Sequence, residues 1–162
     1  MTSVIEKAAS QGVHSLSPHL VCAGAADAIE FYKNAFGAEE LMRLAGADGR
    51  IMHGCVRING SSVMLVDEAP DWGLSGPKAL GGTPVTLHLV VEDADAAAAR
   101  AVEAGATLVM PVADMFWGDR YGLVEDPFGH RWSVSTPVRE MSAEEIQMAA
   151  KDAMCGEAAA PA

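Results

Sequence analysis

The sequence has few cysteines and few basic residues, and each shortage excludes a class of protein. Cys22, Cys55 and Cys155 are odd in number and form no CxxC pair, so neither a disulfide framework nor a thiolate zinc site is indicated. Lys and Arg total 11 against 22 Asp and Glu, which gives a formal net charge of -11. Because binding to phosphate backbones needs clustered cations, nucleic acid is not expected as a partner.

Long apolar runs and the common catalytic signatures are missing as well. No stretch reaches the roughly 18 apolar residues of a membrane span, and Glu6 and Lys7 stand where a signal peptide would need its apolar core. With its unpaired cysteines, the chain is therefore expected in the cytoplasm, without membrane contact. No Ser-His-Asp order, phosphate loop or dinucleotide fingerprint is present.

The sequence does contain an internal repeat. Its 162 residues, half of them hydrophobic and 20% charged, suit one globular domain. "PHLVCAGAADAIEFYKNAFGAEEL" and "LHLVVEDADAAAARAVEAGATLV" share an order of elements, and His19 and His88 are equivalent positions 69 residues apart. The turn at Asn59-Gly60 matches Phe128-Gly129 at the same offset. The repeat therefore spans the whole core.

Each copy of the repeat reads as strand, helix, strand, strand, strand, which predicts an α+β fold. The expected spans are 15–22, 26–36, 38–45, 50–58 and 61–67, then 84–91, 94–104, 106–113, 120–126 and 130–136. Asp27 and Asp93 are expected to cap the helix N-termini, and Gly37 and Gly105 to end the helices.

The ends and the centre of the chain have other roles. Residues 1–14 lack a clear period and are interpreted as a loose arm, ahead of a domain at 15–137 with modules at 15–67 and 84–137. The connection 67–84 is rich in Gly, Pro and acids and is either a linker or a binding rim, with Trp72 as an aromatic gate. Residues 138–162 should form a short C-terminal helix, opened by the capping box of Ser142 and Glu145, and a tail.

The motifs "AIEFYKNAFGAEE", "RIMHGCVRING" and "DPFGHRW" resemble those of the vicinal oxygen chelate superfamily, which groups glyoxalases, bleomycin resistance proteins and dioxygenases. The PhnB-like branch is the most similar. The resemblance covers about residues 15–137. It implies two βαβββ modules forming an open barrel-like sheet around a small-molecule pocket, and commonly a homodimer.

The resemblance also implies where a divalent metal would be held, on the first and fourth strands of each module. The matching positions here are Ser17, Met64, Thr86 and Ser133. None is the imidazole or carboxylate that such an ion prefers. A divalent metal is therefore possible but not favoured.

His19 and His88 each lie two residues beyond the usual ligand position and so face the same side of their strands. They could form a shifted metal site, or they could carry protons without metal. The sequence favours a third alternative, in which both are pocket or core histidines that hydrogen-bond to the backbone.

Further candidates for a binding site surround the second module. Arg120 could orient an anion, and Trp117 and Tyr121 could stack on a planar or cationic group. His53 could line the pocket as well as pack in the core. His130 follows a turn and is expected near solvent, and Cys22 is expected to be a buried small hydrophobe.

Two functions remain open from the sequence. One is a metal-assisted proton-transfer enzyme of isomerase or lyase type, with His19, His88 and Arg120 as its catalytic residues. The other is a binding protein that sequesters a cationic or aromatic, antibiotic-like molecule. The acidic charge and the three tryptophans favour the second function, and the paired histidines favour the first.

Overall fold

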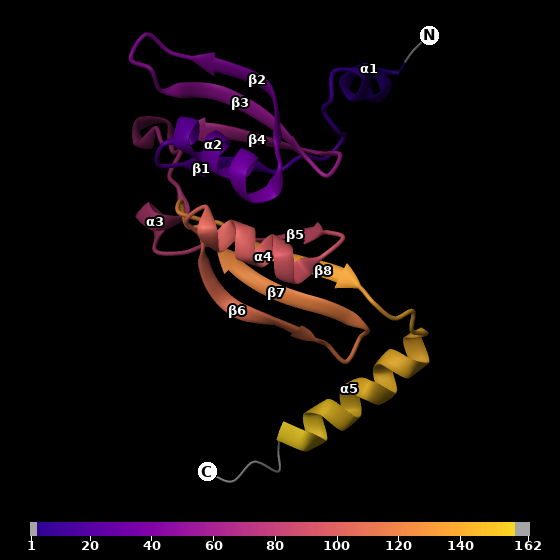
Figure 1. Cartoon of the computed structure of the whole chain (residues 1–162). Coiled ribbons are helices and arrows are strands. Elements are labelled where there is room, and N and C mark those ends of the chain that lie inside the picture. The colour runs from indigo at the N-terminus through magenta and orange to yellow at the C-terminus, as the bar shows by residue number, and fades with distance from the viewer. Residues whose placement is uncertain (1–2, 158–162) are drawn as a thin grey trace.

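The computed structural model describes residues 3–157 and contains two modules with the same order of elements (Figure 1). The first has β1 (His19–Cys22), α2 (Ala25–Phe36), β2 (Glu39–Ala45), β3 (Ile51–Ile58) and β4 (Ser61–Asp67). The second has β5 (Thr86–Val90), α4 (Ala94–Glu103), β6 (Thr107–Asp114), β7 (Asp119–Glu125) and β8 (Arg131–Pro137). The expected α+β fold of two βαβββ units is confirmed.

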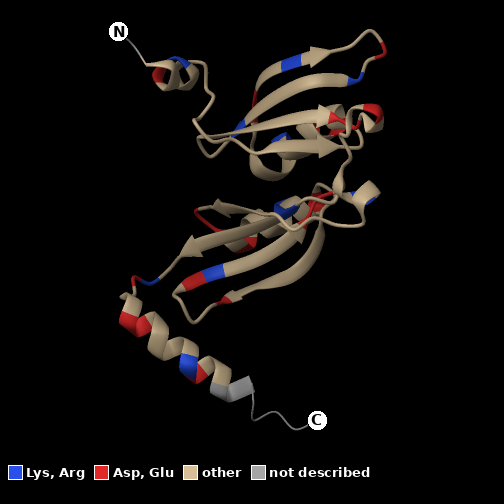
Figure 2. Ribbon diagram, turned by 180° about the vertical axis from the view of Figure 1, so that it is seen from behind, with Lys and Arg blue, Asp and Glu red and all other residues tan. Residues whose placement is uncertain are grey.

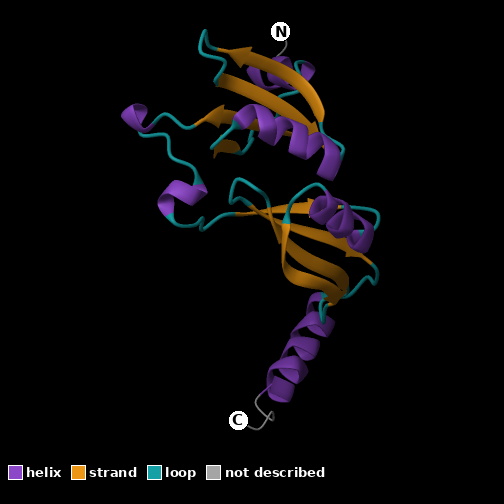
Figure 3. Cartoon of the chain, turned by 60° about the vertical axis from the view of Figure 1, so that its left-hand side comes forward, coloured by secondary structure: helices purple, strands orange, loops and turns teal. Residues whose placement is uncertain are grey.

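The two modules form separate four-stranded sheets, in the orders β1-β4-β3-β2 and β5-β8-β7-β6. In each sheet the first and fourth strands are parallel and the other pairs are antiparallel. The sheets are curved but do not close into a barrel (Figure 3). Asn59 and Gly60 form the turn between β3 and β4 with positive φ angles of 43° and 81°, as the "NG" signal predicts.

The helices lie where the two modules meet. α2 buries one apolar face against its sheet, α4 does the same in the second module, and the two helices contact each other. The two sheets are therefore separated by their helices. Most of the opposite face of each sheet is left uncovered by the other described helices and strands. On the first sheet, His14 and Ser17 cover that face at one end, where both hydrogen-bond to the buried Ser62.

The helix N-termini are capped by one expected residue and one unexpected residue. Asp93 caps α4 by accepting a hydrogen bond from the Ala96 amide at 2.9 Å. For α2, the expectation of Asp27 is wrong. The side chain of Asp67, at the end of β4, accepts from the amides of Gly24 and Ala25 at 3.1 and 2.8 Å instead. A residue distant in sequence supplies this cap, so local spacing cannot reveal it.

A buried carboxylate fastens the two modules to each other. Asp126 is 3% exposed, and its Oδ2 accepts hydrogen bonds from the Tyr32 hydroxyl at 2.7 Å and the Trp132 indole at 3.0 Å. Tyr32 belongs to α2 of the first module. Burial, followed by the nearby Asp126 charge, raises the pKa of Tyr32 well above its ordinary value, so the phenol remains a donor.

The turn after Asp126 makes a second link between modules. The other carboxylate oxygen accepts from the amides of Phe128 and His130. The His130 ring then donates from Nε2 to the Val21 carbonyl of β1 at 3.0 Å. The expectation that His130 is near solvent is wrong, since only 9% of it is exposed. Cys22 beside it is fully buried, and burial raises the pKa of its thiol to about 12.

Helices lie at both described ends of the chain and between the modules. α1 (Val4–Ser10) stands where a loose arm was expected, because Ser3 and Glu6 form a capping box. α5 (Ala143–Glu157) begins as expected at the box of Ser142 and Glu145, and the expected tail falls outside the described residues. The connection between modules contains the short helices η1 (Pro70–Trp72) and α3 (Pro77–Leu80).

Among residues 3–157 there is no helix whose length and apolar character would let it cross a membrane.

Candidate ligand-binding site

A cavity of about 550 Å³ lies at one end of the first sheet. Its walls are the turn between β2 and β3, the start of β3, the end of β4 and the segment 68–74 that follows β4. Acidic residues gather at the turn and at the end of β4 (Figure 2). Two segments that are 14 or more residues apart in sequence thus form one pocket.

The pocket is strongly acidic. Asp48, Asp67, Glu68 and Asp71 line it, and Arg50 is the single basic residue in its wall. Arg50 pairs with Asp48 at 2.7 Å, which lowers the pKa of that carboxyl group below its usual range. Three further carboxylates have no basic partner in the wall, so the pocket attracts cations.

Two of these carboxylates are held by the backbone. Asp67 accepts a hydrogen bond from the Ile51 amide at 2.7 Å, in addition to the two amides that it caps on α2. Glu68 accepts from the Gly76 amide at 2.8 Å. These bonds fix both carboxylates in place, as a preorganised binding pocket requires.

Trp72 stands at the edge of this pocket and is 81% exposed. It ends the single turn of η1, which Pro70 begins and Gly73 stops with a φ of 73°. An exposed indole beside carboxylates can stack on a planar ligand and attract a positive charge to its ring face. The sequence singled out Trp72, but it did not reveal the acidic residues opposite, of which Asp48 comes from another turn.

The uncovered face of the first sheet carries two of the predicted histidines. Gly54 faces α2, since a Cβ on it would lie 3.2 Å from the Ile29 side chain, and so His53 points to the opposite face. The rings of His19 and His53 are 6.0 Å apart on that face. Partial burial and the neighbouring His53 charge lower the pKa of His19 below its ordinary value.

The uncovered face of the second sheet brings together four other candidates. His88 Nδ1 and Ser133 Oγ are hydrogen-bonded at 2.8 Å, as their parallel register requires. The Tyr121 ring stacks on His88 at 6.1 Å with an interplanar angle of 19°, and Trp117 meets Tyr121 edge-on at 5.7 Å. This cluster offers aromatic surface and one imidazole.

Arg120 lies on the other side of β7 from Tyr121, because side chains alternate along a strand. Its guanidinium binds Asp95 of α4 at 2.6 and 2.7 Å and Asp114 of β6 at 3.0 Å. These hydrogen bonds hold the pKa of Arg120 above its ordinary value. The structure therefore does not bring Arg120 to the histidine-bearing faces.

The residues at the usual metal positions do not fit a divalent ion. Ser17 and Ser62 share a hydrogen bond of 2.5 Å, Met64 pairs in register with His19, and Ser133 is engaged by His88. Thr86 lies in register with Arg131, a cation. Among the side chains that the structure describes, no three of His, Cys, Asp or Glu gather as a metal would require, and His19 and His88 lie on separate sheets.

Comparison with known proteins agrees with this fold. The profile of the glyoxalase/bleomycin resistance protein/dioxygenase superfamily matches residues 13–134. An uncharacterised protein of Mycobacterium bovis, Mb0911c, is 56% identical over 138 residues, which cover 83% of this chain and 91% of that protein.

Solved structures show the same similarity. The product of Arabidopsis thaliana At5g48480 is 34% identical with a TM-score of 0.64, covering 75% of this chain and 97% of that one. TnmS3, an antibiotic binding protein from Streptomyces sp. CB03234, is 25% identical with a TM-score of 0.56, covering 76% and 96%. A PhnB protein from Bacillus cereus, at 16% identity and a TM-score of 0.59, shares the fold. Matched over most of its length by sequence and by structure, the chain belongs to the glyoxalase/bleomycin resistance protein/dioxygenase superfamily.

Proposed function

We propose that the protein binds a small aromatic cation in the acidic pocket, with the ring of the ligand against Trp72. One observation carries the proposal: four carboxylates and only one guanidinium line a cavity of about 550 Å³ beside an indole that is 81% exposed. Cation–π attraction and long-range charge act in the same direction here. The volume suits a drug-sized molecule. The similarity to TnmS3, an antibiotic binding protein, supports binding as the activity.

The test compares two ligands of the same shape and different charge. 1-Methylquinolinium carries a positive charge, and 1-methylnaphthalene is its neutral counterpart. The cation should bind about tenfold more tightly, and added salt should reduce that advantage because it screens the carboxylates. Calorimetric titration of the full chain gives both dissociation constants. Equal affinities for the two compounds would refute the proposal.

Two variants locate the binding. Trp72→Ala should weaken 1-methylquinolinium about threefold to tenfold, the usual range for a cation–π contact. Asp71→Asn should weaken the cation and leave the naphthalene unchanged. Trp117→Ala and Glu144→Gln, an indole and a carboxylate distant from the pocket, are the matched controls. Loss of affinity in the controls but not in the pocket variants would place the ligand elsewhere.

We also propose that two copies of the chain associate. Members of the superfamily bind small molecules and often form dimers, and both uncovered sheet faces of this chain carry exposed apolar side chains. Met42 and Leu44 of the first sheet and Val90 of the second are 49, 53 and 54% exposed. A second copy that covers these faces would remove that area from water.

A further inference from the structure

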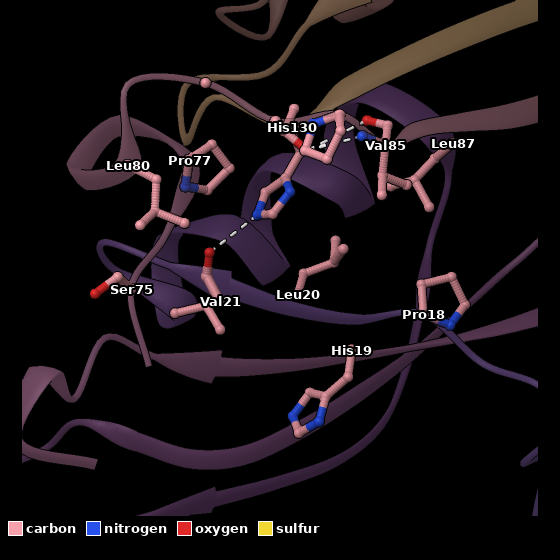
Figure 4. Close-up of a pocket in the computed structure, with 13 residues that line it drawn as sticks. Pro18, His19, Leu20, Val21, Ser75, Pro77, Leu80, Val85, Leu87 and His130 are labelled. Carbon is pink, nitrogen blue, oxygen red and sulfur yellow. Dashed lines mark hydrogen bonds between the residues drawn. The ribbon is translucent and has the colours of Figure 1, made fainter. Parts of the chain in front are cut away.

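A second cavity, of about 340 Å³, lies between the modules and shares no residue with the acidic pocket. Its walls come from β1, from the connection that contains α3, from the start of β5 and from the turn that carries His130 (Figure 4). The apolar part of the wall consists of Pro18, Leu20, Val21, Pro77, Leu80, Pro84, Val85 and Leu87. Its size falls at the lower end of the range for small-molecule sites.

The cavity has an opening formed by apolar side chains. Leu80 of α3 and Val85 before β5 line it and are 70 and 58% exposed. The opposite wall is closed by Leu20, which belongs to the buried core. The cavity is thus an apolar recess that a small molecule can enter from solvent.

His130 supplies the cavity with one fixed polar group. The ring is 9% exposed, and Nε2 must carry the hydrogen because the Val21 carbonyl can only accept. In a neutral imidazole of that form, Nδ1 is an acceptor. None of the described groups makes a hydrogen bond to Nδ1. Every described side-chain nitrogen or oxygen that is buried does have a hydrogen-bond partner, so an atom without one cannot be buried. Nδ1 therefore has accessible surface, and the space that His130 lines is this cavity.

The position of His130 is set by the fold rather than by the ring itself. Its amide is held by Asp126, and the preceding Gly129 has a φ of 90°. A side chain at Gly129 would come within 3.0 Å of Pro77, so the turn lies directly against α3. The "DPFGH" turn thus brings an imidazole to the inner end of the recess and supports one of its walls.

We propose that this cavity binds a small apolar molecule with a single hydrogen-bond donor, of the phenol class. The O–H of the ligand donates to His130 Nδ1, and its apolar body lies among Leu20, Leu80 and Leu87.

Three other polar residues line the cavity. The His19 ring points away from it (Figure 4), the Thr83 hydroxyl is hydrogen-bonded to Val85, and Ser75 lies on α3's side of the wall. The rest of the wall is apolar and favours a ligand with few polar groups, because a polar group that finds no partner there loses its hydration. The site is independent of the acidic pocket and of the cation that we propose for it.

The test uses 4-butylphenol and 4-butylanisole, in which a methyl group replaces the hydroxyl hydrogen, so that the ether has no O–H to donate. The phenol should bind the full chain about tenfold more tightly than the ether in calorimetric titration. Equal dissociation constants would overturn the proposal. Trp72→Ala should change neither constant, so that failure here and failure of the cation site can be distinguished.

Variants of His130 isolate the acceptor. His130→Phe keeps a ring but has no Nδ1, and the ratio of the two dissociation constants should fall to about one. His130→Asn places a carbonyl near Nδ1 and should keep part of the ratio. Because each ratio is taken within one protein, a general loss of stability cancels. A ratio unchanged in His130→Phe would refute the role of Nδ1.

A third variant fills the cavity without touching His130. Val85→Trp, at the rim, should abolish binding of the phenol and the ether alike. Val138→Trp, at a site that is 58% exposed like Val85 but lies outside the cavity, should leave both constants unchanged. Circular dichroism is used to check that each variant is folded. Undiminished binding to folded Val85→Trp would overturn the assignment to this cavity.

Discussion

Asp126 precedes the turn at residues 127–129, and its carboxylate accepts hydrogen bonds from groups of both modules. A buried charge is costly unless every oxygen is hydrogen-bonded, and here each oxygen accepts two donors. Two of the donors are backbone amides that shape the turn. The others are the Tyr32 hydroxyl of the first module and the Trp132 indole. A single side chain therefore links the local turn to the contact between modules.

Asp126→Ala should lower the free energy of unfolding by about 3–5 kcal/mol, since it leaves buried donors without an acceptor. Tyr32→Phe removes one of these donors and should cost about 1.5–3 kcal/mol. Urea denaturation measures both values. Asp152→Ala on the exposed part of α5 is the control and should change stability by less than about 0.5 kcal/mol. A cost for Asp126→Ala no greater than that of the control would contradict this role.

His19 makes the stability depend on pH. Burial and His53 lower its pKa in the folded protein, so the unfolded chain binds a proton more readily. His19 therefore does not change the free energy of unfolding at a pH well above about 6.5, the pKa of histidine in the unfolded chain. As the pH falls through that value, the unfolded chain takes up the proton first and the free energy of unfolding decreases. His19→Gln should reduce the loss of unfolding free energy between pH 7.5 and pH 5. An equal loss in His19→Gln and the unaltered protein would show that other groups cause it.

At the scale of helices and strands, the sequence predicted most of what the structure contains. The repeat placed both modules, and the observed strands and helices start and end within a few residues of the expected spans. Local signals were enough to place the helices and strands. The hydrophobic period, the glycines that end helices and the "NG" turn each depend on only a few neighbouring residues. α1 was missed although Ser3 and Glu6 carry the same capping signal that correctly opened α5.

Asp67 links two elements of the first module. Its carboxylate accepts hydrogen bonds from two amides at the start of α2 and from one at the start of β3. Asp67→Ala should lower the unfolding free energy by about 2–4 kcal/mol, more than an ordinary cap because three donors lose their partner. Asp27→Ala, at the position expected from sequence, should cost less than about 1 kcal/mol. Chemical denaturation compares the two. A larger effect at Asp27 would restore the sequence-based assignment.

For the whole molecule, the limits of sequence reasoning follow from distance along the chain. The acidic pocket joins Asp48 to Trp72, and the second cavity joins Val21 to His130. The bond between His130 and Val21 spans 109 residues, and no short motif encodes such a contact. The structure places six residues that the sequence singled out as candidates on the pocket rim or on the uncovered faces: Trp72, His19, His53, His88, Tyr121 and Ser133. It could not show that the two sheets of one chain are separated by their own helices.

The separation of the two sheets by their helices has a consequence for the candidate residues. In one chain, His19 with His53 and His88 with Tyr121 lie on different uncovered faces, beside apolar side chains that water contacts. If the first sheet of one copy covers the second sheet of another, both faces are buried and two equivalent clefts form by symmetry. Light scattering during gel filtration should then give a mass of twice 16.9 kDa.

Leu44→Glu places a charge on the face of the first sheet and should shift the particle to a single chain mass, because burial of an unpaired carboxylate is unfavourable. Val102→Glu, on the exposed side of α4, adds the same charge outside these faces and should leave the mass unchanged. Binding of 1-methylquinolinium to dissociated Leu44→Glu should persist, since the acidic pocket is complete within one chain. A single chain mass for the unaltered protein at micromolar concentration would refute association through the sheet faces.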